Sequence, residues 1–402
     1  MISVRRRLRK NIVLGQTAGL TLNAAAYAFG ISIAYGLLGS ATFGIVFGIL
    51  GILSLASDIL DFGTTENLSF DLAKYGYDET YKKQRMNSIW VRYLIFLPIW
   101  IIGAFLFLKI DLLQILLLSF YPILFIFSKL NQRILRNCGF IRISNIGSFL
   151  EKSGFLVCPL ILFPRIGSVY ILIFSVLAGL FLSQVYLGFA IRKHVVQISY
   201  VQSVEKKNKS NWLAIQSVVT DLMLLDIWIL TRILGPDQAG NYALIMKTQP
   251  YLILGFLSFS QMIVPVAVGG EANRIYLWGK RNYHPVALNL TLLLFVGIFA
   301  SPIMHRVLPN YSLQIVDVIP IYIVYCAAIG FIAIVAQILN AYGLAKKVAI
   351  FEIAKTFGFL IFLISFAEYS NLAGVFFGIT GFSVIASCVS IFLMYRLLGK
   401  DQ

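Results

Sequence analysis

Three lysines lie in otherwise apolar stretches of the chain, and their type and spacing suit the binding of an anion. Lys247 is about ten residues inside one apolar run, and Lys152 and Lys355 are about eight residues inside two others. A charge at membrane depth costs at least about 2.5–3.5 kcal/mol on insertion scales, so it requires a partner or a purpose. Three ammonium groups at similar depth therefore predict a cationic cavity that offsets the desolvation of an anionic ligand.

Ion pairing within the protein is the alternative role for two of these lysines. Lys152 directly follows Glu151, and Lys355 stands three residues after Glu352 on the same helix face. Arg92 lies only a few residues inside its apolar run, where it suits an interfacial anchor as well as a ligand contact. We therefore expect Lys247, Lys152, Lys355 and Arg92 to be the candidate binding residues.

Two carboxylates in one apolar run are candidates for ion coupling. Asp221 and Asp226 are five residues apart, which places them about 140° apart on a helix, and neither has a basic residue at i±4. An unpaired carboxylate in a membrane can carry a proton or bind a cation. We predict that one of them couples transport to protons or sodium. The alternative is a salt bridge from this helix to Lys247 on the next one.

Asp61, together with Asp58, stands near the end of another apolar run, where a gate and a helix cap are equally good interpretations. Glu151 and Glu352 are further candidates for gating or coupling. The four cysteines and three histidines are scattered without metal-ligand spacing. The sequence therefore predicts no metal site, no cofactor and no enzymatic activity, since no cluster of His, Asp or Ser at matching depth is visible.

The composition shows which elements must position these residues. Of the 402 residues, 59% are apolar and only 12% are charged, against about 25% charged in soluble domains. The mean hydropathy is +0.84. Because a spanning helix needs roughly 20 apolar residues, about a dozen helices and short loops account for the whole chain.

Apolar runs separated by charge, glycine or proline predict twelve helices. Their bounds are 12–38, 41–62, 88–108, 112–129, 143–163, 168–190, 212–234, 238–268, 284–303, 315–340, 348–367 and 371–397. Two loops, 67–86 and 271–283, have room for short amphipathic helices on the membrane surface, and Pro265 is a candidate for a bend.

The distribution of basic residues predicts the orientation. Of the 33 Lys and Arg residues, only Lys109, Arg165, Arg232 and Arg306 fall on the side opposite the N-terminal cluster RRRLRK. By the positive-inside rule, both termini are then cytoplasmic. The net charge of +16 is thus explained by anionic lipid headgroups and an anionic substrate, and it does not call for nucleic acid.

The two halves of the chain resemble each other. YGLLGSATFG from Tyr35 matches TRILGPDQAG from Thr231, ILRNCGFIR matches ILNAYGLAKK, and a looser match aligns Glu151 with Glu352. An even number of spans separates the copies, which predicts a parallel repeat of two six-helix lobes, 1–200 and 201–402. Such repeats occur in secondary transporters, where the substrate path lies between the halves.

LLGSATFG, SLASDILDFG and the segment from Trp212 to Gly269 resemble bacterial polysaccharide-export flippases of the Wzx O-antigen type. The larger superfamily with these motifs also holds multidrug exporters and the lipid II flippase. The resemblance implies two six-helix lobes around a central cavity. It also implies an undecaprenyl-pyrophosphate-linked oligosaccharide as the substrate, moved from the cytoplasmic to the outer leaflet.

We therefore expect an all-α, multi-pass protein of the bacterial cytoplasmic membrane that flips this lipid by alternating access. Its expected partners are the lipid-linked oligosaccharide, membrane lipids and the polysaccharide polymerase machinery. The alternative is a cation-coupled multidrug exporter of the same fold. Lysines at mid-depth argue against the alternative, because they repel a cationic cargo.

Overall fold

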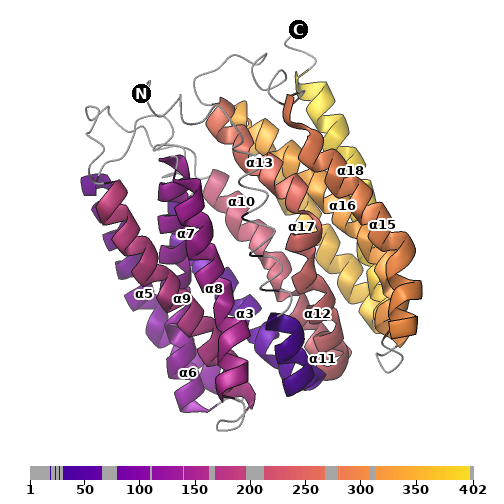
Figure 1. Cartoon of the computed structure of the whole chain (residues 1–402), viewed down its shortest axis with the longest axis horizontal. Helices are drawn as coiled ribbons and strands as arrows, with labels where there is room; N and C mark the ends of the chain where they lie inside the picture. The colour runs from indigo at the N-terminus through magenta and orange to yellow at the C-terminus, as the bar shows by residue number, and fades with distance from the viewer. Residues whose placement is uncertain are drawn as a thin grey trace.

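The computed structural model describes residues 19, 23, 27, 30–65, 79–108, 111–138, 140–162, 168–195, 212–267, 279, 281–307 and 313–398. Within these ranges the regular elements are all helical, as the unbroken apolar runs predicted. Figure 1 shows two groups of roughly parallel helices that meet along a central seam.

The first half contributes α3 (Ser40–Asp61), α5 (Glu79–Phe107), α6 (Leu112–Ser119), α7 (Tyr121–Asn137), α8 (Ile141–Leu162) and α9 (Ser168–His194). Residues 31–38 are also helical and precede α3. The purple and magenta helices α5 to α9 form one group in Figure 1.

The second half contributes α10 (Trp212–Asp221), the 3₁₀ turn η1 (Leu222–Leu225), α11 (Asp226–Ile233), α12 (Pro236–Leu252), α13 (Leu254–Ala267), α15 (His284–Val307), α16 (Leu313–Ala341), α17 (Ala345–Tyr369) and α18 (Leu372–Leu398). The orange and yellow helices α13 to α18 form the other group in Figure 1. Each of the twelve predicted spans coincides with one of these helices, with a pair of them, or with the described part of the first helix.

The helices are suited to a bilayer. Within the described residues, eight stretches are long and apolar enough to cross a membrane, and α15 holds a shorter apolar stretch, His284–Phe299. The outer faces of α5, α15 and α18 carry exposed large apolar side chains such as Ile99, Leu288 and Phe392. In hydrocarbon such faces need no cover, so the chain is a multi-pass membrane protein.

The backbone confirms the internal repeat. Gly39 precedes α3 with φ 79° and ψ 161°, and Gly235 precedes α12 with φ 88° and ψ 165°. Only glycine adopts this region freely, and the two sites are the ones that the LLG and ILG words aligned. Gly343, between α16 and α17, also has a positive φ, whereas its predicted counterpart Gly139 lies outside the described residues.

The seam between the halves runs along α3. A Cβ atom added to Gly51 would collide with the carbonyl of Leu224, and one added to Gly63 would crowd Ala214, so α3 runs antiparallel to α10–η1–α11. Near its start, α3 instead crosses α12. A Cβ atom at Gly44 would collide with Pro236, and one at Gly240 with Ser40. The repeat-related glycines thus allow the two halves to approach at backbone distance.

Several predicted boundaries were wrong. The fourth span was predicted to end at residue 129, but α7 continues to Asn137, because its polar residues 128–136 find partners inside the protein. The helix of the third span begins at Glu79, nine residues before its predicted start, so residues 79–86 extend it rather than form a separate surface helix. Most of the loop 271–283 lies outside the described residues.

Two spans of the second half are interrupted. The 3₁₀ turn η1 separates α10 from α11 without any glycine or proline, and the close approach of Gly51 to Leu224 occurs at this turn. The eighth span breaks at Ile253, three residues after Pro250, which lacks the N–H that continues the ladder. The side chain of Pro265, the predicted bend, is outside the described residues.

Candidate functional site: a cavity lined by two lysines

A cavity lies where α12 meets the first half of the chain. It has about 460 Å³ of empty space, part of which is open to the surroundings. Four aromatic rings line it, from Tyr27, Phe47, Tyr121 and Phe125. Tyr121 and Phe125 are stacked with ring centroids 5.3 Å apart, and the Tyr121 hydroxyl is 3.0 Å from that of Ser54. The cavity therefore has flat apolar walls that could hold a ring.

Three charged side chains share the lining of this cavity. They are Lys247 from α12, and Glu151 and Lys152 from α8. Two of the three predicted lysines are thus brought together from the two halves of the chain. Their charges repel each other across a medium of low dielectric constant, and a bound anion would relieve that repulsion.

Lys247 is the less compensated of the two lysines. Its ammonium lies 5.3 Å from the centre of the Phe47 ring, a cation–π contact with α3 of the other half. Among the described residues it has no carboxylate within 4 Å. The predicted salt bridge to Asp226 is therefore not formed, although the two charges still attract each other.

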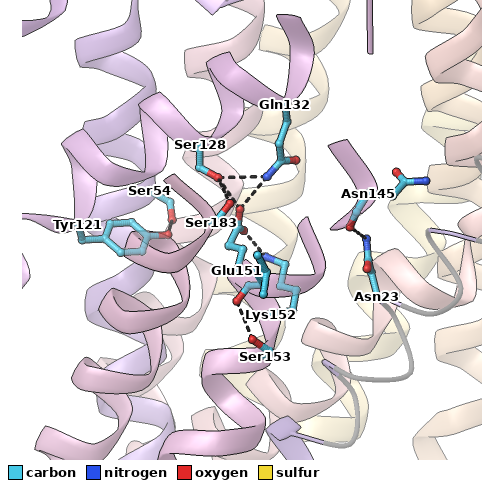
Figure 2. Close-up of polar contacts among 11 residues, drawn as sticks. Asn23, Ser54, Tyr121, Ser128, Gln132, Asn145, Glu151, Lys152, Ser153 and Ser183 are labelled. Atoms are coloured by element: carbon cyan, nitrogen blue, oxygen red, sulfur yellow. Dashed lines mark hydrogen bonds and ion pairs between the residues drawn. The ribbon is translucent and has the colours of Figure 1, made fainter. Parts of the chain in front are cut away.

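Lys152 is held by its neighbour. Its ammonium donates to the Glu151 carboxylate at 2.7 Å and lies 5.1 Å from the centre of the Tyr27 ring. Figure 2 shows that Glu151 also accepts hydrogen bonds from Ser128 and Gln132 of α7, and that the Ser128 hydroxyl in turn lies 3.2 Å from that of Ser183 of α9. The ion pair that the sequence offered as an alternative is present, and yet Lys152 also lines the cavity.

Lys355 lies elsewhere. It pairs with Glu352 on the same face of α17, and both side chains are almost fully buried, 7% and 4% exposed. Glu352 also accepts a hydrogen bond from Thr220 of α10 at 3.2 Å. Neither residue belongs to the lining of the lysine cavity, so the structure brings together two, and not three, of the predicted lysines.

The two aspartates of the seventh span have different partners. Asp226, the first residue of α11, is buried and accepts hydrogen bonds from the Tyr242 hydroxyl at 2.9 Å and from the backbone N–H of Ile227 at 2.6 Å. Asp221 lies on the other side of the 3₁₀ turn, 4.0 Å from the ammonium of Lys129. Asp226 is thus bound within the second half, whereas Asp221 faces the first.

Lys129 is a site residue that the sequence analysis missed. It stands at the predicted end of the fourth span, but it lies within α7 and bridges two carboxylates, Asp58 at 3.0 Å and Asp221 at 4.0 Å. Asp58 is buried, and its second oxygen has no hydrogen-bond partner. The polar positions 128, 129, 132 and 136 follow a helical spacing, a pattern that predicts a continued helix with a polar face.

Asp61 and Arg92 form hydrogen bonds at the C-terminal end of α3. The Asp61 carboxylate accepts hydrogen bonds from the backbone N–H and hydroxyl of Thr65, at 3.1 and 2.7 Å. The Arg92 guanidinium donates to the carbonyls of Leu60 and Asp61, at 2.8 and 3.1 Å, which suits a cation at a helix C-terminus. These contacts favour capping for Asp61 and anchoring for Arg92. Neither residue lines the cavity.

Among the described residues, no group of three or more His, Cys, Asp or Glu side chains lies close enough together to bind a metal ion. The cavity has the groups for non-covalent binding: two ammonium groups for an anion, one carboxylate that is paired with Lys152, and aromatic rings for a flat partner. Such a set can hold and release a charged molecule without breaking a covalent bond.

No protein-family model and no curated protein matches the chain. Solved structures do match it along its whole length. The P26A mutant of a MATE protein has a TM-score of 0.66 at 16% identity, with 98% of both chains covered. A MOP superfamily transporter from Pyrococcus furiosus, reported to have a binding pocket of reverse polarity, has a TM-score of 0.66 at 15% identity, covering 97% of this chain and 96% of that one.

A multidrug resistance MATE family transporter of the MOP superfamily, in an outward-facing conformation, has a TM-score of 0.63 at 14% identity, with 98% of both chains covered. At these identities the likeness concerns the fold. It covers both helical groups, because nearly the whole chain is matched. The chain therefore has the fold of the MATE transporters of the MOP superfamily.

Proposed function

We propose that this protein is a flippase for a lipid-linked oligosaccharide whose headgroup contains a pyrophosphate, such as an undecaprenyl-pyrophosphate-linked repeat unit of O-antigen. The observation that carries the proposal is the shared cavity of Lys152 and Lys247, one lysine from each half of the chain. Two cations beside aromatic rings suit a pyrophosphate followed by a sugar, because the rings can stack against the apolar face of a pyranose.

The contacts along the seam are compatible with alternating access. Near Gly44 and Gly240 the halves touch at backbone distance, and the cavity begins farther along α3, at Phe47, Leu50 and Ser54. The end of α3 at Ser40 is therefore the sealed end. With the termini in the cytoplasm of a bacterium, as the basic residues predict, the cavity receives its substrate from the cytoplasmic side and delivers it when the seal opens.

Ion coupling is assigned in this proposal to the seventh span. Asp226 is a buried carboxylate without an ion pair inside 4 Å among the described residues, and Asp221 faces Lys129 across the seam. Binding of a proton or a sodium ion to either one would change the charge next to the 3₁₀ turn, where a helix is easiest to bend. No resident cofactor is part of the mechanism.

A second candidate function is cation-coupled multidrug export, which the multidrug MATE transporter among the similar structures favours. The charge of the cavity argues against it. A cationic drug would meet two lysines and a single carboxylate, and that carboxylate is already paired. The anionic cargo therefore remains the better fit.

A deletion strain tests the proposal. We expect cells without this protein to accumulate undecaprenyl-pyrophosphate oligosaccharide on the cytoplasmic side and to lose surface polysaccharide. Wild-type protein should relieve both defects, and Lys247→Ala should not. Lys346→Ala is the matched control, because Lys346 lies at the start of α17, against Trp212 and outside the cavity lining.

Intact surface polysaccharide without accumulation would contradict the flippase assignment and favour the exporter.

A further inference from the structure

The Glu151 carboxylate has more partners than an ion pair needs. It accepts hydrogen bonds from the ammonium of Lys152 at 2.7 Å, from the hydroxyl of Ser128 at 2.9 Å and from the amide of Gln132 at 3.0 Å (Figure 2). Only 12% of its side chain is exposed. A carboxylate accepts about four hydrogen bonds, so Ser128 and Gln132 keep it partly satisfied when Lys152 leaves.

Lys152, in contrast, is free to change partner. Its side chain is 30% exposed and lines the cavity above the Tyr27 ring. Its ammonium therefore has two anions within its reach in a loaded transporter: the carboxylate of Glu151 and the anionic group of the substrate. The α7 residues that support Glu151 make that exchange possible without leaving a bare buried carboxylate.

The other half of the chain provides a comparison. Glu352 and Lys355 form the same kind of ion pair at the position that the repeat aligns, but both are buried and neither lines the cavity. Because this pair is buried away from the cavity, its lysine cannot reach a substrate there. Both pairs contain a carboxylate, and they differ in whether the lysine reaches the cavity.

We infer that Glu151 is an internal counter-anion that competes with the substrate for Lys152. It holds the lysine in place while the cavity is empty, and it takes the lysine back when the substrate leaves. Without Glu151, two uncompensated lysines would bind a pyrophosphate too tightly for fast release. Transport requires an affinity that is low enough for the substrate to dissociate. Glu151 is thus a positioning residue that acts through Lys152. This inference rests on the proposed function.

The test measures binding of undecaprenyl pyrophosphate to the full-length protein in lipid nanodiscs. Glu151→Gln keeps the shape of the side chain and hydrogen bonds to Ser128 and Gln132, but it removes the competing charge. We expect this variant to bind the probe about tenfold more tightly, with a slower dissociation rate, because one charge-assisted hydrogen bond no longer has to be broken. Turnover in a flipping assay should fall correspondingly.

Two further variants separate this effect from a change in folding. Glu352→Gln removes the equivalent carboxylate outside the cavity and should leave the dissociation constant unchanged. Lys152→Met should weaken binding, and adding Glu151→Gln to it should produce no gain. A merely structural role of Glu151 would lower the affinity of Glu151→Gln, or leave it unchanged, and either result overturns the inference. If wild-type protein does not bind undecaprenyl pyrophosphate at all, the proposed function itself is wrong.

Discussion

At the scale of single residues, the lysines in the membrane-spanning helices have different partners. Lys247 meets an aromatic ring and no carboxylate within 4 Å among the described residues, while Lys355 is locked to Glu352. Sequence spacing predicted both ion pairs of the repeat, but it could not tell which lysine reaches a cavity. That distinction depends on how helices far apart in the sequence pack, which local spacing does not encode.

The coupling role of Asp226 is tested at this scale. We expect Asp226→Asn to remove the dependence of transport on a proton or sodium gradient and to lower the transport rate by about tenfold, equivalent to about 1.4 kcal/mol. The cause is the loss of the charge that Tyr242 binds inside the second half. Transport into vesicles with imposed gradients is the measurement. Glu368→Gln, an exposed carboxylate in α17, is the control. Unaltered transport with unaltered ion dependence would rule out Asp226 as the coupling residue.

At the scale of elements, the seam along α3 has a glycine contact at one end and an ionic contact toward the other. Gly44 and Gly240 allow the starts of α3 and α12 to cross, and Ser40 donates a hydrogen bond to Asp237 at 2.5 Å beside that crossing. Toward the Asp61 end, Lys129 connects Asp58 and Asp221. The sequence predicted equivalent glycines, but the contact between the two copies came only from the fold.

The glycine seal gives a prediction with a matched control. Gly240→Ala places a methyl group against the Ser40 carbonyl, which should cost about 1–3 kcal/mol in the closed seam and favour its opening. A cysteine at Leu50, in a background without the four native cysteines, should then react with an impermeant thiol reagent from the side where α3 begins. Gly36→Ala should not cause this reaction, because nothing lies within 4 Å of its new Cβ atom. Equal labelling in both variants would contradict the seal.

The ionic contact is tested by a double-mutant cycle. Lys129→Met and Asp221→Asn should each loosen the seam by about 1 kcal/mol, a modest value because the Lys129 side chain is 35% exposed. The seam of the double variant should be no looser than the seam of the more strongly affected single variant. The measurement is the spin-label distance distribution between exposed positions on α5 and α18. If the distance distribution of the double variant broadens by the sum of the two single effects, Lys129 and Asp221 act independently.

At the scale of the whole molecule, hydropathy and the repeat predicted most of the architecture. Within the described residues, every predicted span corresponds to helix, the first of them through residues 30–38, because a bilayer requires long apolar segments and tolerates few others. The sequence did not predict the 3₁₀ turn between Asp221 and Asp226, since no glycine or proline marks it. It also ended the fourth span too early, because partners for the polar face of α7 lie on α3, α8 and α9.

The boundary between the two lobes, placed by the repeat at residues 200 and 201, stays a prediction because residues 196–211 lie outside the described part of the chain. The same holds for most of the first helix, which the repeat relates to α10–η1–α11. The seam and the cavity, in contrast, consist of described residues.

We propose above that the cavity carries an anionic, lipid-linked headgroup across the membrane. The most direct measurement uses purified protein in liposomes that contain undecaprenyl-pyrophosphate-linked oligosaccharide labelled on its sugar. An impermeant quencher reports how many headgroups face outward. We predict that wild-type protein exchanges the headgroups between leaflets and that Lys247→Ala does not. Headgroups that stay in place, while the same vesicles transport a cationic drug, would contradict the proposed flippase function.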